Sequence, residues 1–150
     1  MISLKKRNQG FTIVELLIVI VVIGILALLV ITTYSGIQAK ARNSKRQTDV
    51  QAVQTQLEAY FAQNGHYPSL TDMNSSSWLT TNMKSLDVGA LKDPQGSSST
   101  LASSAAAKVY SYAVTNSSGT SCESDDTTCA QYTLTATLEG GGTYAKSNLD

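Results

Sequence analysis

The chain has 150 residues, which is room for one globular domain and a long helix but not for two domains. Its formal charge is zero, yet residues 64–150 hold four bases and eight acids, which argues against a globular part that binds nucleic acid through bulk charge. With a single histidine and no phosphate-loop, dinucleotide or nucleophile-elbow motif, the sequence does not predict an enzyme.

An apolar stretch, Phe11–Ile31, is the dominant feature of the amino-terminal part. About twenty such residues span the hydrocarbon core of a bilayer as a helix. A short basic leader, Lys5-Lys6-Arg7, precedes it and ends in Gly10. A secretory signal peptide has its small cleavage residue after the apolar run. Here cleavage at Gly10 would remove only the leader, retain the helix, and create a new α-amine on Phe11.

Glu15 is the one charge inside this stretch. A carboxylate in hydrocarbon is costly and marks a functional candidate with a partner. The nearest candidate cation after cleavage is the Phe11 amine, either on the same helix or on a neighbouring chain. The alternative is that Glu15 lies at headgroup level and reaches water.

The string Gly10-Phe11-Thr12-Ile13-Val14-Glu15, followed by a retained apolar helix, resembles the type IV pilins and the pseudopilins of type II secretion systems. The resemblance is strongest over residues 5–70. It implies cleavage after Gly10 by a prepilin peptidase, N-methylation of Phe11, and pairing of Glu15 with the Phe11 amine of an adjacent subunit.

The function that the resemblance implies is a structural subunit of a type IV pilus, serving adhesion, twitching motility or DNA uptake. Its partners would be other copies of itself, the inner-membrane platform protein and the assembly ATPase, with DNA or a host surface as further possibilities. The chain would cross the cytoplasmic membrane once before assembly and then lie in an extracellular filament. A type II secretion pseudopilin is the alternative, and a monomeric membrane-anchored binding domain is a third reading.

No proline precedes Pro68, so one helix is expected from about residue 11 to residue 63. Its second half is amphipathic, with apolar residues at three- and four-residue steps: Val50, Val53, Leu57, Tyr60 and Phe61. The bases Lys40, Arg42, Lys45 and Arg46 precede this stripe. They suit a solvated helix face, and lipid headgroups, a neighbour's acids or DNA are the alternatives.

Asn64-Gly65 is expected to end the helix, and the string NGHYP resembles the turn found there in many pilins and pseudopilins. His66 is predicted as a turn residue, and Tyr67 is predicted to pack back on the helix. A short helix is expected over residues 76–86. The string KDPQG at residues 92–96 resembles the entry to the sheet in major pseudopilins and related pilins.

Three strands are predicted near the carboxyl end, at residues 109–115, 132–138 and 143–146, with Gly140-Gly141-Gly142 as a turn. The predicted fold class is therefore α+β and pilin-like, a long helix packed against a small antiparallel sheet. The expected organisation is a leader at 1–10, an assembly helix at 11–39, an amphipathic half at 40–64 and a globular head at 65–150.

Cys122 and Cys129 lie seven positions apart in one loop, and an exported chain with two cysteines is expected to join them in a disulfide. No cofactor is predicted. Glu123, Asp125 and Asp126 are weak calcium candidates, as some pseudopilins bind calcium in a carboxy-terminal loop, although their spacing is not that of an EF-hand.

Overall fold

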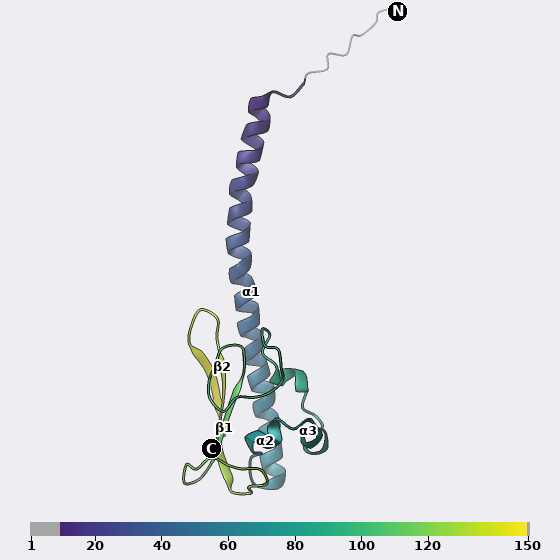
Figure 1. Ribbon diagram of the computed structural model, residues 1–150, viewed down its shortest axis with the longest axis vertical. Helices are drawn as coiled ribbons and strands as arrows, with labels where there is room; N and C mark the ends of the chain where they lie inside the picture. The colour runs from purple at the N-terminus through teal and green to yellow at the C-terminus, as the bar shows by residue number, and fades with distance from the viewer. Residues whose placement is uncertain (1–9, 150) are drawn as a thin grey trace, which may run out of the picture. The chain divides into compact units, whose positions relative to one another are not determined.

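The computed structural model describes residues 10–149, apart from the side chain of Thr32. The leader bases Lys5, Lys6 and Arg7 lie outside the described residues. The long helix α1 runs over Ile13–Asn64 (Figure 1). The chain divides into two compact units after Gln38. The predicted long helix is confirmed, and it is unbroken from Gly24 through Thr32.

Helix α1 ends because Gly65 adopts the left-handed conformation, with φ of +77°. The Gly65 N–H donates to the Phe61 carbonyl at 2.7 Å, which satisfies one of the carbonyls left open at the helix end. The chain then reverses through His66 to Tyr67. Tyr67 is 1% exposed, stacks on Phe61 at 4.5 Å, and donates its hydroxyl to Glu58 at 2.9 Å. The predicted turn and the packing of Tyr67 on the helix are therefore confirmed.

Three strands form one antiparallel sheet in the order β1-β2-β3: β1 Ser111–Asn116, β2 Cys129–Thr137 and β3 Thr143–Ser147. Tyr112 lies opposite Leu134 in the β1–β2 pair, and both are buried, whereas the neighbouring Thr133 is exposed. This is the predicted alternation of a sheet with one buried face. The α+β, pilin-like arrangement of a long helix and a three-stranded sheet is confirmed.

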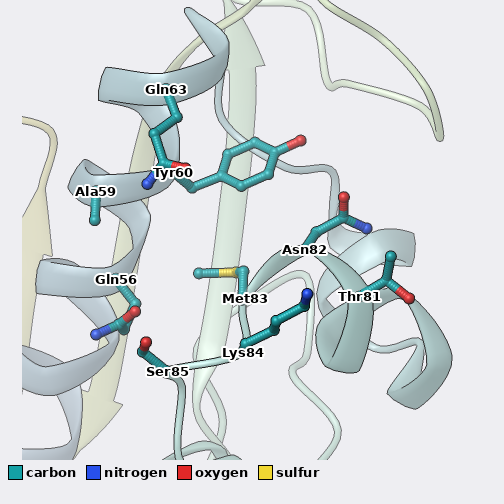
Figure 2. Close-up of a pocket in the computed structure, with 9 residues that line it drawn as sticks. All are labelled: Gln56, Ala59, Tyr60, Gln63, Thr81, Asn82, Met83, Lys84 and Ser85. Carbon is teal, nitrogen blue, oxygen red and sulfur yellow. The ribbon is translucent and has the colours of Figure 1, made fainter.

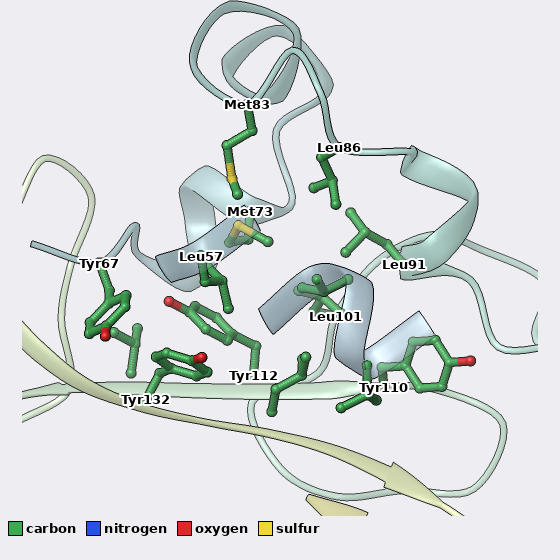
Figure 3. Packing of buried hydrophobic residues seen from close by; sticks show 14 of the residues in the cluster. Leu57, Tyr67, Met73, Met83, Leu86, Leu91, Leu101, Tyr110, Tyr112 and Tyr132 are labelled. Carbon is green, nitrogen blue, oxygen red and sulfur yellow. The ribbon is translucent and has the colours of Figure 1, made fainter. Parts of the chain in front are cut away.

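The core of the second unit lies between the carboxy-terminal half of α1 and the buried face of the sheet (Figure 3). Leu57 is fully buried there beside Tyr112, Tyr132 and Met73. The predicted stripe on α1 supplies one side, because Val50, Val53 and Leu57 are 0–1% exposed. A buried side chain of this size contributes roughly 1.5–3 kcal/mol, so this half of α1 depends on the globular unit for its stability.

The segment between α1 and the sheet contains short helices that the sequence pattern predicts poorly. They are α2 Leu70–Met73, α3 Ser76–Asn82 and the 3₁₀ helix η1 Val88–Leu91. The expected helix over residues 76–86 is too long, because Met83 leaves helical geometry and ends it. Helix α2 forms around a capping box, in which Ser69 and Asp72 exchange side-chain and backbone hydrogen bonds.

Candidate functional site

The predicted processing site lies just before α1. Gly10 is exposed, and a Cβ added there would meet no atom within 4 Å. Phe11 is 91% exposed. An extended, uncovered peptide of this kind is accessible to a protease. The roles of Gly10 in cleavage and of Phe11 in methylation stay predictions.

A capping box begins α1. The Thr12 N–H and hydroxyl donate to Glu15 Oε2 at 2.8 and 2.6 Å, and the Glu15 N–H donates to Thr12 Oγ1 at 3.2 Å. These bonds satisfy donors that would otherwise be open at the helix start. The threonine three residues before Glu15 is the signal that could have predicted this box. Pairing of Glu15 with a neighbour's Phe11 amine stays a prediction.

Apolar side chains surround the first part of α1 on every side. From Ile13 to Ile31 the large hydrophobic side chains are between 49% and 84% exposed. By length and composition, α1 is the one helix among the described residues that could cross a membrane. So large an uncovered apolar surface marks a membrane or protein contact.

Two of the four bases in the predicted basic group are not on a solvated face, and this expectation is wrong for them. Arg46 is 1% exposed and holds Asp93 through Nε at 2.7 Å and Nη2 at 3.0 Å. Arg42 holds both carboxylate oxygens of Glu139 at 2.7 Å, and Arg46 Nη1 reaches Glu139 at 2.8 Å. Neither arginine is thus free for lipid or DNA. Lys45, half-exposed, pairs with Asp49 at 2.9 Å, and Lys40 is exposed.

These contacts perturb the acid that joins the two arginines. Hydrogen bonds from Arg42 and then from Arg46 lower the pKa of Glu139 to about 2. The hydrogen bond to Asp93 raises the pKa of Arg46 above its ordinary value. Sequence reasoning missed this cluster because the acids lie 47 and 93 or more residues away from the arginines. The KDPQG string was the available signal, since Asp93 and Gln95 both accept from Arg46.

The cysteine loop is closed as expected. A disulfide joins Cys122 to Cys129, whose Cα atoms are 5.9 Å apart. Within the loop, Asp126 Oδ1 accepts from the backbone and hydroxyl of Thr128 at 2.8 and 2.7 Å, and these bonds lower the pKa of Asp126. Asp126 and Thr128 thus form an Asx turn within the loop.

The calcium candidates Glu123, Asp125 and Asp126 are not gathered into a group of close ligands. The single such group in the described part of the chain is Asp126 with the two cysteines, whose sulfurs are already bonded to each other. A carboxylate-rich calcium shell is therefore not assembled by these residues, and calcium binding stays a prediction that we do not extend.

A cavity of about 300 Å³ opens between the end of α1 and the end of α3 with the segment that follows it (Figure 2). Tyr60 and Gln63 come from α1, Asn82 from α3, and Met83 and Lys84 from the following segment. His66 lies edge-on to the Tyr60 ring at 5.7 Å. Its place in the bend directly after α1 confirms the predicted turn position of His66.

Comparison with known proteins finds similarity in the amino-terminal part of the chain. The family described as the prokaryotic N-terminal methylation motif matches residues 5–31. The type II secretion system core protein G of Dickeya chrysanthemi is 38% identical over 66 residues, which are 44% of this chain and 43% of that protein. Its counterpart in Aeromonas hydrophila is 40% identical over 65 residues, 43% of this chain and 46% of that protein.

The type IV major pilin protein PilA of Myxococcus xanthus is 38% identical over 63 residues, 42% of this chain and 29% of that protein. In each case the match spans less than half the length of the relative. No solved structure matches the chain significantly. The methylation motif and the resemblance to pilins and pseudopilins are confirmed for this part.

Proposed function

Because its amino-terminal part carries the prokaryotic N-terminal methylation motif and is similar to pilins and pseudopilins, we propose that this chain is a filament-forming subunit. It is cut after Gly10, methylated on Phe11, held in the membrane by the apolar part of α1, and then assembled. The observation that carries the proposal is the apolar surface of Ile13–Ile31, which residues 10–149 leave uncovered.

Burial of Glu15 is the step that links processing to assembly. Among the described hydrogen bonds, its carboxylate accepts through Oε2 only, and both of those bonds come from Thr12. Oε1 therefore has acceptor capacity for a second donor. A Phe11 amine of an adjacent subunit supplies the positive charge that burial of a carboxylate requires.

The type II secretion pseudopilin is the better supported of the two finer functions. Most of the similar proteins are core protein G of such systems. The subunit then serves a short filament that works with a secretion machinery. The type IV pilus is the second candidate, and similarity to PilA favours it.

Peptide mass spectrometry of the mature amino terminus tests the shared part of the proposal. We expect a chain that starts at methylated Phe11. Gly10→Val should leave full-length precursor in the membrane, while Gly36→Ala, a substitution at an exposed helix glycine, should mature normally. Normal maturation of the Gly10 variant would contradict the peptidase assignment.

Deletion of the gene separates the two finer functions. Loss of protein secretion without loss of surface filaments fits the pseudopilin. Loss of sheared surface filaments that contain this chain, with secretion intact, fits the pilus and would overturn our preference.

A further inference from the structure

A second cavity adjoins the one in Figure 2. It measures about 410 Å³ and is lined by α2, α3 and the disulfide-closed loop. Thr81 and Asn82 of α3 line both cavities, so the two meet at the end of α3. We name the second one the α2–α3 cavity. Its size falls in the range of small-molecule sites, about 300–1,000 Å³.

One wall of the α2–α3 cavity is aromatic. Trp78, the single tryptophan of the chain, lines it and is half-buried. Its ring packs at 5.3 Å from Tyr60, which lines the other cavity. The indole is thereby held in place from outside the α2–α3 cavity. A fixed ring of this kind offers an apolar face for stacking and an N–H for hydrogen bonding.

A buried carboxylate faces the same cavity. Asp72 is 8% exposed and lines it. Its Oδ2 accepts from the backbone and hydroxyl of Ser69 at 3.1 and 2.7 Å. Its Oδ1 accepts a single described bond, from Ser124 at 3.2 Å. Since a carboxylate oxygen has two acceptor positions, Oδ1 can take a further donor from a ligand.

The disulfide-closed loop supplies a further part of the lining through Ser124 and Asp125. Asp125 has a φ of +63°, a left-handed conformation that aspartate tolerates better than most residues. The disulfide and this turn hold the loop against α2. This lining is therefore part of the fold and not a loose segment.

The chemistry of the lining residues selects the ligand. They include two carboxylates and no lysine or arginine, which disfavours phosphates and acidic sugars. Asp72 and Asp125 belong to no group of three close metal ligands in the described part of the chain. The remaining lining side chains are hydroxyls and an amide: Thr71, Ser75, Ser77, Thr81 and Asn82. This set suits a ligand with many hydroxyl donors and one apolar face.

We propose that the α2–α3 cavity binds a neutral saccharide ring. Trp78 stacks against the C–H face of the sugar, Asp72 accepts from a hydroxyl, and the serine and threonine hydroxyls complete the contacts. All of these groups come from the globular unit of one chain. The proposal thus goes beyond filament assembly and does not depend on it.

Fluorescence of Trp78 tests the proposal directly, because no other tryptophan contributes. The full chain is purified in a detergent without a sugar headgroup. It is titrated with the methyl glycosides of glucose, galactose, mannose and N-acetylglucosamine, and in parallel with calcium chloride and spermidine. We expect a saturable change with at least one glycoside. A saturable change with only calcium or spermidine, or with none of the probes, would overturn the proposal.

Two variants test the contacts by calorimetry with the responding glycoside. Asp72→Asn removes a charged acceptor and should weaken binding roughly tenfold. Trp78→Phe keeps a ring beside Tyr60 and should weaken binding roughly two- to tenfold. Thr80→Ala, on α3 but outside both cavities, is the matched control and should bind normally. Circular dichroism checks that each variant is folded, and native affinity in both folded site variants would refute the assignment.

Discussion

The buried ion pair between Arg46 and Asp93 offers the sharpest test of how the globular unit is held together. Both side chains are 1% exposed, and two hydrogen bonds join them. Arg46→Ala leaves the carboxylate of Asp93 buried without its charge partner. Breaking such a pair costs about 3–5 kcal/mol.

We expect the loss in free energy of unfolding for Arg46→Ala to be about 3 kcal/mol, the lower limit of that range, because both acids keep other partners. Asp93 keeps the Gln95 N–H, which donates to its Oδ1 at 2.8 Å. Glu139 keeps Arg42 and is a quarter exposed, so its loss of one partner adds little. We therefore expect about 3 kcal/mol, a large part of the roughly 5–15 kcal/mol that stabilises a typical domain.

Urea unfolding of the full chain in detergent, followed by Trp78 fluorescence, measures this loss. Lys40→Ala is the matched control on the same helix, because Lys40 is exposed and forms none of the described ion pairs. It should cost less than about 1 kcal/mol. The double variant Arg46→Met with Asp93→Leu should recover much of the stability, since no charge is then left buried. Equal stability of the Arg46→Ala and Lys40→Ala variants would refute the reasoning.

Three further predictions concern the same unit. Hydrogen bonds hold the pKa of Glu139 near 2 in the folded chain, below the ordinary value of about 4.3. Its stabilisation is therefore complete above that ordinary value and is lost as the pH falls toward 2, so Glu139→Gln should flatten the pH dependence of unfolding there. Replacing Cys122 and Cys129 by serine should lower the free energy of unfolding by about 2–3 kcal/mol with the apolar helix still in the membrane. Gly96→Ala should destabilise the unit by about 1–3 kcal/mol, because the new Cβ would lie 2.6 Å from the Lys108 carbonyl oxygen.

Each of these has a distinct contrary outcome. If Glu139→Gln unfolds at low pH as the unsubstituted chain does, the ion pairs of Glu139 with Arg42 and Arg46 do not determine its acid stability. Equal stability with and without reductant would show that the disulfide contributes nothing. Gly89→Ala is the control for Gly96, since the three atoms nearest to its new Cβ belong to the Asp87 side chain, the closest at 3.0 Å. Equal effects at the two glycines would contradict the close approach at Lys108.

The amino-terminal part could be predicted from the sequence because its physics is local. Glycine before an apolar run, one acid inside it, and no proline before Pro68 determine where the helix lies and what surface it carries. The sheet was also predictable, because Tyr132, Leu134 and Ala136 alternate with threonines, and the structure buries those three. Period-two alternation survives in any fold that covers one face of a strand.

Other features depend on partners far apart in the chain. Arg46 lies in a basic stretch of sequence that is typical of a solvated helix face. It is buried only because the KDPQG loop and the turn after β2 return to α1 and supply its acidic partners, Asp93 and Glu139. Asp72 belongs to the local capping box of α2, and it lines a cavity only because the disulfide-closed loop returns to it through Ser124. Local pattern determines periodicity and caps, whereas burial of a charge requires a partner that only the tertiary structure brings within a few ångströms.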